Sequence, residues 1–393
     1  MTGKYFGKEN KLGDIGLLDN VLKGFMDMRE DSISKILAAQ KRGQKIVGVY
    51  CTYCPKELII AAGAIPVGLC GTREEPIPAA EAILPRNLCP LIKSSFGFAV
   101  TDTCPFFHLS DLVVGETTCD GKRKMFELLQ ELKPVHVMQL PHQQRDEASF
   151  SFWLEELRRL KTRLEEEIGT EISDDKIRNA ITIVKREKEA LKALFDLSRK
   201  DPPPFSGMEL LTISWLKGFS SDAEIFYSML EELVEVAHHR KVQSGKGKPR
   251  VLLTGCPVGL GSEKIVRLIE ELGGIVVAME NCSSYKTLEL QVEDNGDDPL
   301  LSLAQAYLKI PCSCMSPNPY RLELLSRMID DFKVQAVVDL TWQACHTYNI
   351  EAGAVQKMVK GIGLPYMHLE TDYSSSDDGH IKVRLEAMLE IVS

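Results

Sequence analysis

The sequence has no long apolar run and no apolar leader. Its longest apolar stretch extends only from Leu58 to Cys70 and is interrupted by Gly63 and Pro66, whereas a membrane-spanning helix needs about 20 consecutive apolar residues. The first fifteen residues, MTGKYFGKENKLGDI, lack the apolar segment of a signal peptide. We therefore expect no membrane span, no signal peptide and a cytoplasmic location.

The sequence also lacks an excess of positive charge and lacks the common nucleotide-binding motifs. The 393 residues include 47 Lys and Arg against 56 Asp and Glu, a formal net charge of −9, whereas binding to a phosphate backbone requires a basic surface. Neither GxGxxG nor the Walker A pattern occurs, because TGCPVGLG (254–261) has the wrong glycine spacing and SGKGKPR (244–250) precedes a predicted strand. Nucleic acid is therefore not an expected partner, and nucleotide binding is not expected, although the glycine turn at 254–261 has the composition of a phosphate cradle.

Cysteine, by contrast, is abundant. Eleven cysteines without a secretion signal argue against a disulfide framework. In a reducing compartment such an excess indicates metal binding, thiol chemistry or small buried apolar side chains. The positions of the cysteines must distinguish these alternatives.

The pattern of strands and helices predicts an α/β fold with two parallel-sheet domains and a helical connector. Short β-branched runs such as KIVGVY and DLVVGE alternate with helical segments in both halves of the chain, as in βαβ units. Between the halves, charged amphipathic stretches predict helices, one of them capped by Ser173. Strand, Cys-Pro, helix and Gly recur in the same order in both halves, which indicates a duplicated fold. The predicted parts are an N-terminal helical segment (1–45), a first α/β domain (46–145), the helical connector (146–248) and a second α/β domain (249–393).

Six of the cysteines stand just past a predicted strand. They are Cys51, Cys70 and Cys119 in the first α/β domain and Cys256, Cys282 and Cys345 in the second. The carboxyl ends of parallel strands are where ligands bind, because the following loops and helix N-termini converge there. This placement favours a ligand site over core packing for the set, while core packing is an equal alternative for Cys70 and Cys282.

Four cysteines precede a proline, namely Cys54, Cys89, Cys104 and Cys256. Proline suits the first position of a helix, where the helix dipole would favour the thiolate form of the preceding cysteine. An ordinary proline turn is an equal alternative for any one of these pairs. The thiolate is the form that binds iron, so the pairs are compatible with a metal site.

Zinc and iron are rival occupants of such a site. Cys51-x-x-Cys54 and Cys312-x-Cys314 could each supply two zinc ligands, but they lie in different predicted domains, whereas a structural zinc site gathers two close pairs in a small module. An iron–sulfur cluster, whose thiolates can come from distant loops, fits the spacing better.

Three acid or base candidates accompany the thiols. His346 directly follows a cysteine, and Glu57 and Glu116 stand close to cysteines, so each is a candidate proton donor. Lys122 belongs to a basic run at 122–124 that could contact an anionic ligand or an acidic partner, but for which we expect a solvated helix face. His136, beside an apolar run, is expected to satisfy core contacts.

Several segments together carry a family resemblance. They are VYCTYCPKELIIAAGAIPVGLCG, LPRNLCPLIKSS, DLVVGETTCDGKRKM, IPCSCM and VVDLTWQACHTYNIE with GLPYMHLETDYS. Over nearly the whole chain, the sequence resembles the 2-hydroxyacyl-CoA dehydratase and benzoyl-CoA reductase superfamily, and within it is most similar to the double-cubane cluster proteins. The resemblance implies two flavodoxin-like, that is Rossmann-like, domains with a helical part, a homodimer, and an oxygen-sensitive iron–sulfur site between the domains.

The resemblance also implies a set of cluster ligands. A typical dehydratase subunit holds one 4Fe-4S cubane through three cysteines, which motif matching places at Cys51, Cys89 and Cys345. The chain has further cysteines, and an 8Fe-9S double cubane would need about that many thiolates. These further cysteines are Cys119, Cys256, Cys312 and Cys314, and the choice between the last two as ligand is open.

The function implied by the resemblance is reduction of small molecules at a double-cubane iron–sulfur cluster. The electrons would come from a separate ATP-hydrolysing iron–sulfur activator, itself a homodimer. One alternative is a subunit of a 2-hydroxyacyl-CoA dehydratase, which removes water from an acyl-CoA by a ketyl-radical route. Another is an electron-storage or cluster-carrier protein without a substrate of its own.

Overall fold

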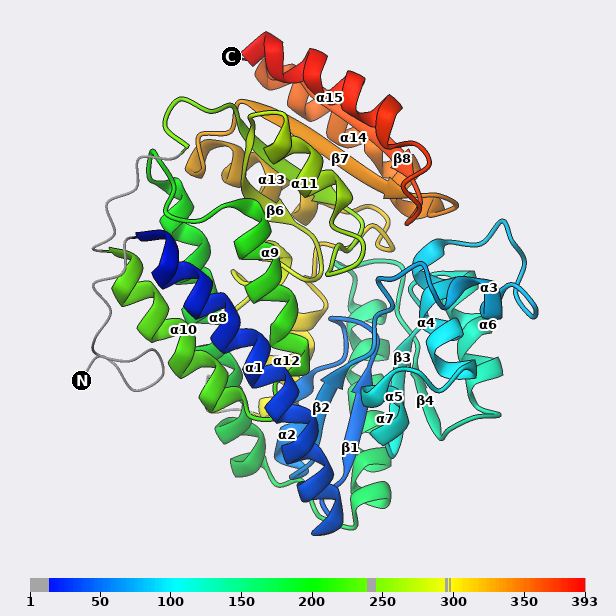
Figure 1. Ribbon diagram of the computed structural model, residues 1–393. Coiled ribbons are helices and arrows are strands. Elements are labelled where there is room, and N and C mark those ends of the chain that lie inside the picture. The colour runs from blue at the N-terminus through cyan, green and yellow to red at the C-terminus, as the bar shows by residue number, and fades with distance from the viewer. Residues whose placement is uncertain (1–13, 239–244, 294–295, 297, 393) are drawn as a thin grey trace.

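The computed structural model describes residues 14–238, 245–293, 296 and 298–392. Residues 1–13 of the predicted N-terminal segment and residues 239–244 of the predicted connector lie outside this part. The remainder of the N-terminal segment forms helix α1 (Asp14–Lys41). Figure 1 shows two α/β units stacked one above the other, with long helices along one side.

The first α/β unit contains a parallel sheet with the strand order β2-β1-β3-β4. Its strands are β1 (Ile46–Val49), β2 (Ile65–Gly68), β3 (Leu112–Glu116) and β4 (Val135–Met138), and its helices are α2 (Lys56–Ala61), α3 (Ile77–Ala80), α4 (Pro90–Val100), α5 (Pro105–Leu109) and α6 (Asp120–Leu129). All five residues of β3 are buried, as expected for a parallel strand covered on both faces. Successive residues of β1 contact different cores, because side chains alternate across a strand: Ile46 belongs to one core and Val47 to the other.

The second α/β unit repeats this topology, with the strand order β6-β5-β7-β8. Its strands are β5 (Arg250–Gly255), β6 (Ile275–Glu280), β7 (Ala336–Trp342) and β8 (Tyr366–Thr371), and its helices are α11 (Lys264–Glu271), η3 (Tyr285–Thr287), α12 (Pro299–Tyr307), α13 (Pro319–Asp331), α14 (His346–Ile362) and α15 (Asp378–Val392). Each strand overlaps a predicted β-branched run. The predicted α/β fold with two parallel sheets is therefore confirmed, and the shared strand order agrees with a duplication.

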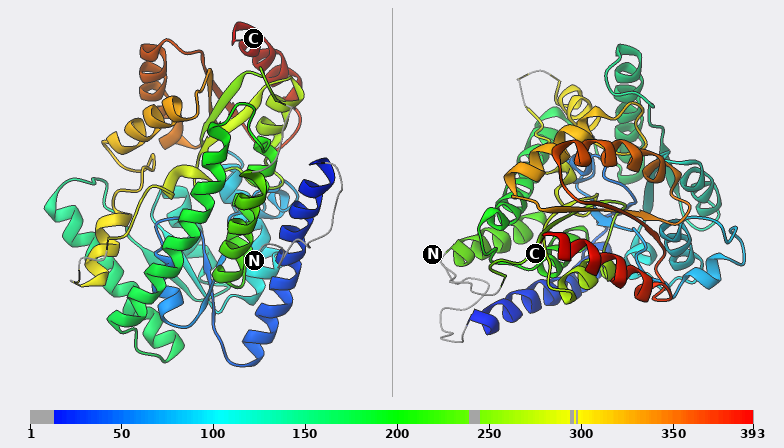
Figure 2. Two further views of the ribbon diagram at one scale, coloured as in Figure 1. Left: turned by 90° about the vertical axis from the view of Figure 1, so that its left-hand side faces the viewer. Right: turned by 90° about the horizontal axis from the view of Figure 1, so that it is seen from above.

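Long helices connect the two sheets. They are α7 (Glu147–Ile168), α8 (Asp174–Asp196), η1 (Leu197–Arg199), α9 (Gly207–Leu216), η2 (Lys217–Phe219) and α10 (Ala223–His238). Ser173 occupies the N-cap position of α8, as predicted, but its side chain makes no capping hydrogen bond to that helix. Helix α8 packs against α10 and α2, α1 packs against α9, and α9 packs against β6 of the second unit. Helices α1, α8, α9 and α10 therefore lie together along one side of the molecule (Figure 1, and the left view of Figure 2), whereas α7 packs against β4.

Each of the two hydrophobic cores combines segments from both halves of the chain. Helix α12 comes from the second half of the sequence, yet it packs against α7 and α8, and its Leu303 shares a core with Trp153 and with Val114 of the first sheet. The other core joins Phe96 of α4 to Val251 of β5. Packing therefore ties the two units together across the strand-poor connector.

Two glycines inside helices give a matched test of this packing. A Cβ atom at Gly97 in α4 would lie 2.1 Å from the carbonyl oxygen of Pro76, whereas a Cβ at Gly353 in α14 would meet no atom within 4 Å. We expect Gly97→Ala to lower the free energy of unfolding by about 1–3 kcal/mol and Gly353→Ala to raise it by about 0.5–1 kcal/mol. Urea denaturation followed by circular dichroism measures both, and a shift in the same direction for both variants would contradict the prediction.

His136 on β4 makes the stability of the protein depend on pH. Burial, together with Arg159 and Arg163, lowers the pKa of His136 to about 4, and its Nε2 atom is buried without a hydrogen-bond partner in the part of the chain described here. An unfolded histidine titrates near 6.5, so the unfolded state binds more protons between about pH 4 and 6.5 and stability falls as the pH is lowered through that window. Between pH 7.5 and 5, we expect His136→Gln to lose about 1–2 kcal/mol less than the wild type in urea denaturation; equal losses would contradict the assignment.

No helix among the described residues is both long enough and apolar enough to cross a membrane.

Candidate active site: a thiol-lined cavity

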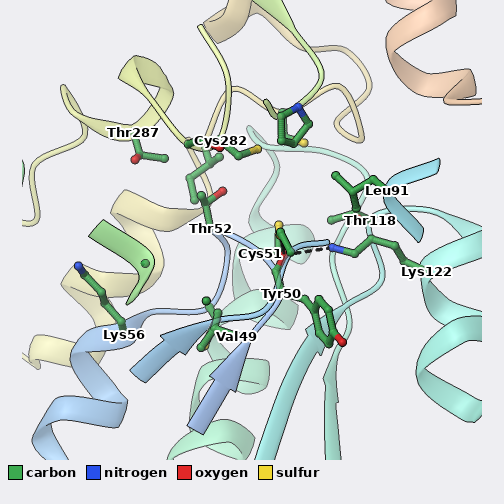
Figure 3. Close-up of a pocket in the computed structure, with 18 of the residues that line it drawn as sticks. Val49, Tyr50, Cys51, Thr52, Lys56, Leu91, Thr118, Lys122, Cys282 and Thr287 are labelled. Atoms are coloured by element: carbon green, nitrogen blue, oxygen red, sulfur yellow. Dashed lines mark hydrogen bonds between the residues drawn. The ribbon is translucent and has the colours of Figure 1, made fainter. Parts of the chain in front are cut away.

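Every cysteine of the chain except Cys104 lines one cavity of about 1390 Å³. The wall includes all six cysteines that follow strands, so the carboxyl ends of both sheets face the same space. Figure 3 shows Cys51 at the end of β1, with Cys282 on the opposite side of the pocket. The structure therefore brings together all seven cysteines that were predicted as ligands, namely Cys51, Cys89, Cys119, Cys256, Cys312, Cys314 and Cys345.

Helix N-termini position three of these thiols. Cys89, Cys119 and Cys345 are the N-cap residues of α4, α6 and α14. The sulfur of Cys119 accepts a hydrogen bond from the backbone N–H of Lys122 at 3.4 Å. Free backbone N–H groups and the helix dipole favour negative charge at such positions.

The expectation that a Cys-Pro pair opens a helix holds for some pairs only. Cys89 and Cys104 cap helices whose first residue is the proline. Pro55 is itself the N-cap residue of α2, so Cys54 precedes that helix by one further residue. For Cys256 the prediction is wrong, because α11 begins only at Lys264.

Cys256 is held instead by a turn that follows β5. Gly255 has a φ of +113°, and a Cβ atom there would lie 2.1 Å from the carbonyl oxygen of Leu340, so only glycine fits without strain. The N–H of Cys256 donates to that same carbonyl at 2.8 Å, and the N–H of Trp342 donates to the sulfur of Cys256 at 3.3 Å. The turn thereby fixes the thiol against β7.

Cys89, Cys256 and Cys345 form a first thiol group. Hydrogen bonds from Cys256 and Cys89 lower the pKa of Cys345 to about 3, while the same contacts and burial raise the pKa of the two donor thiols. Cys119 lies close enough to Cys345 for the charge of one to affect the other. These cysteines come from both α/β units, so the group spans the boundary between them.

Cys51, Cys312 and Cys314 form a second thiol group. A hydrogen bond from Cys314 lowers the pKa of Cys312 to about 6, against the opposing effect of burial and with help from Lys286. Negative charge on Cys312 raises the pKa of Cys51, and negative charge on Cys51 raises the pKa of Cys314. Negative charge on Cys312 also raises the pKa of Cys282. The cavity thus contains two neighbouring sets of convergent thiols. Of the three cysteines that the resemblance assigned to one cubane, Cys89 and Cys345 belong to the first set and Cys51 to the second.

Lys122 is buried beside the second set, which corrects the expectation of a solvated helix face. Its side chain is 8% exposed, and its Nζ donates to the carbonyl oxygen of Tyr50 at 3.5 Å (Figure 3). Burial disfavours its charge, but the negative charges of Cys51 and Glu116 raise its pKa. Lys122 is therefore an ammonium group placed to compensate negative charge in the cavity.

The three predicted acid candidates are dispersed. His346 lines the cavity, whereas Glu57 and Glu116 are buried behind its wall. Glu57 accepts a hydrogen bond from the Tyr307 hydroxyl at 2.6 Å. Burial raises the pKa of Glu116 to about 7, with Lys122 opposing the rise. Of the three, His346 alone is placed to reach a molecule in the cavity.

The thiols converge in two groups, and no single point of the cavity gathers all of them. Among the described residues, no three His, Cys, Asp or Glu side chains form a group able to hold a single metal ion. A tetrahedral zinc site requires its ligands to meet at one ion, whereas the thiolates of a cubane each bind a different iron. The donor set therefore fits an iron–sulfur cluster better than zinc.

Sequence reasoning missed several residues of the cavity wall. Cys54, Cys70 and Cys282 line it beside the predicted ligands, and the position of the last two just past strands was the available signal. Lys56 and Lys217 also line it. Nothing in the sequence distinguishes these lysines from lysines on a solvated helix face.

Comparison with known proteins gives the family. The profile of the family described as 2-hydroxyglutaryl-CoA dehydratase, D-component, matches residues 51–392. "Putative dehydratase subunit YjiM" from Escherichia coli (strain K12) is 45% identical over 95% of this chain and 98% of its own length. The (R)-phenyllactyl-CoA dehydratase beta subunit of Clostridium sporogenes is 22% identical over 95% and 98%, and a benzoyl-CoA reductase subunit of Thauera aromatica is 23% identical over 67% and 68%. The chain therefore belongs to the 2-hydroxyglutaryl-CoA dehydratase D-component family of enzyme subunits, as its resemblance to the dehydratase and benzoyl-CoA reductase superfamily predicted.

Proposed function

We propose that the chain is an oxygen-sensitive reductase component that holds an 8Fe-9S double-cubane cluster in the thiol-lined cavity and reduces small molecules there. The observation that carries the proposal is the presence of two neighbouring thiol groups in one cavity, the first with Cys345 and the second with Cys312. One cubane in this superfamily would need three thiolates: the first group offers Cys89, Cys256 and Cys345, and the second offers Cys51 with Cys312, Cys314 or both.

Each part of the cavity has a role in this proposal. The thiolates of Cys51, Cys89, Cys119, Cys256, Cys312, Cys314 and Cys345 are the candidate ligands, with Cys312 and Cys314 as alternatives for one position. When bound, the cluster supplies stored electrons at low potential. Lys122 offsets negative charge beside Cys51, and His346 is the candidate to hand a proton to the substrate, because it alone of the three acid candidates lines the cavity.

The proposal includes partners that follow from the family resemblance. They are an ATP-hydrolysing iron–sulfur activator that delivers the electrons and a second copy of this chain in a cytoplasmic homodimer. The lack of a Walker A pattern in this sequence agrees with ATP hydrolysis by a separate protein.

A 2-hydroxyacyl-CoA dehydratase subunit is the second candidate. Relatives that are named as beta subunits of acyl-CoA dehydratases match nearly the full chain, and this favours it. Such a subunit would hold one cubane and act on an acyl-CoA together with a paralogous partner.

The iron and acid-labile sulfide content of anaerobically purified protein, with an EPR spectrum of the reduced form, separates the two candidates. We expect about eight irons per chain for a double cubane. About four irons would favour the dehydratase subunit. Zinc in place of iron would overturn both.

A further inference from the structure

One side of the cavity is lined by three lysines from three different elements. Lys56 belongs to α2, Lys188 to α8 and Lys217 to η2, and all three line the same cavity as the thiols. Figure 3 shows Lys56 on the side of the pocket away from Lys122, with Thr287 and Cys282 above it. This lysine pocket is distinct from the thiol groups and has no part in the ligand set.

Of the three lysines, only Lys56 forms an ion pair with a carboxylate among the described residues. Lys56 forms an ion pair with Glu187. Lys188 stacks its ammonium 5.3 Å from the centre of the Tyr307 ring, and no carboxylate of the described residues lies within ion-pair distance of it. Lys217 has neither an ion-pair nor a hydrogen-bond partner among residues 14–238, 245–293, 296 and 298–392. Two ammonium groups in the wall are thus available to a ligand.

The charges around Lys217 do not cancel. Burial, followed by repulsion from Lys56, lowers the pKa of Lys217 to about 8, with Lys188 also lowering it and Glu187 opposing. The carboxylate that acts most strongly on Lys188 is Glu57. The carboxylates that act on these three ammonium groups are Glu57, behind the wall, and Glu187. The other carboxylates that line the cavity, Asp120, Asp222 and Glu224, are exposed. The lysines therefore keep an excess of one positive charge.

We propose that the lysine pocket binds the carboxylate of a small monoanionic substrate. A carboxylate accepts charge-assisted hydrogen bonds from ammonium groups, and a single negative charge would neutralise the pocket. Cys282 lines the same cavity and lies within electrostatic reach of Lys217, so a molecule held by its carboxylate would extend toward the thiols. The inference rests on the proposed reductase function and narrows its substrate class to small carboxylic acids.

Calorimetric titration of acetate into anaerobically purified protein tests the pocket. At pH 7 and fixed ionic strength we expect saturable binding, weakened at least tenfold in Lys217→Met and in Lys188→Met, because removing one partner of a buried charge pair costs that much or more. Lys185→Met is the matched control: it lies on the same helix α8, is 51% exposed and pairs with Glu189 outside the cavity. Acetate binding to this control should match that of the wild type.

The remaining outcomes each decide a separate point. Absence of saturable acetate binding, or an unchanged Kd in both Lys217→Met and Lys188→Met, would overturn the pocket. Tighter binding of inorganic phosphate than of acetate would overturn the carboxylate assignment in favour of a phosphate group such as that of a coenzyme.

Iron measured on the same samples distinguishes the failure of the lysine pocket from the failure of the cluster proposal. Full iron without acetate binding rejects the pocket alone, and acetate binding with little iron rejects the cluster alone. Lys217→Gln, checked by circular dichroism, replaces the Met variant if that variant does not fold.

Discussion

Replacement of Cys345 by alanine is expected to reduce the iron content from about eight atoms per chain to about four or fewer. Cys345 is the acceptor of hydrogen bonds from both Cys89 and Cys256, and its pKa of about 3 makes it the member of that group most readily present as thiolate. It also caps α14, where the helix dipole favours negative charge. Without it, Cys89 and Cys256 lose the thiolate that both of them contact, and the first thiol group keeps only two of its three members.

Cys104→Ala is the matched control for this measurement. Cys104 also caps a helix, α5, and also precedes the first helical residue, but it does not line the cavity. A second comparison is Cys70→Ala, because Cys70 lines the cavity while its thiol donates to the carbonyl oxygen of Tyr50 at 3.0 Å. Both variants should retain the full iron and acid-labile sulfide. Full iron in Cys345→Ala, or equal loss in Cys104→Ala, would refute the ligand assignment.

The fold could be predicted from the sequence because its strands are local signals. Each β-branched run forms a parallel strand. Where a strand is buried on both faces, its run is nearly continuous in apolar residues, as in RVLLTG of β5 and IVVAME of β6. The convergence of Cys51 and Cys256 on one cavity followed from the same logic, since both stand just past strands. The cysteines could be placed in one site because the carboxyl ends of parallel strands lie at the same edge of a sheet.

The burial of individual charged side chains could not be predicted from the sequence, because it depends on tertiary packing. Lys122 looks solvated in a run of basic residues, yet it is buried beside Cys51, because α6 packs one face against the sheet. Glu116 stands three residues before Cys119, but as the last residue of β3 it is fully buried behind the cavity wall. The direction of a side chain at a strand end depends on register and on the following turn, which spacing along the chain does not fix.

Replacement of Arg321 by methionine is expected to lower the free energy of unfolding by about 3–5 kcal/mol. Arg321 is fully buried, and its guanidinium contacts Glu280 at 3.1 Å, Asp339 at 3.8 Å and Glu351. Burial opposes ionisation of Glu280, yet Lys286 and Arg321 hold its pKa below the usual range. Methionine fills similar space but leaves these carboxylates without their shared cation, and a buried unpaired charge is costly.

Arg327→Met provides the matched control on the same helix, α13. Arg327 is 55% exposed and pairs with Glu289 at 2.7 Å, and exposed pairs contribute about 0–1 kcal/mol. Urea denaturation of both variants by circular dichroism should therefore separate them by at least about 2 kcal/mol. Equal midpoints would mean that the carboxylates around Arg321 are protonated or rehydrated without cost.

The Arg321 network also borders the cavity. The Arg321 guanidinium lies 4.8 Å from the centre of the Tyr348 ring, and Tyr348 lines the cavity. Loosening this network should therefore lower the retention of iron in the Arg321 variant before global unfolding, while the Arg327 variant keeps its iron.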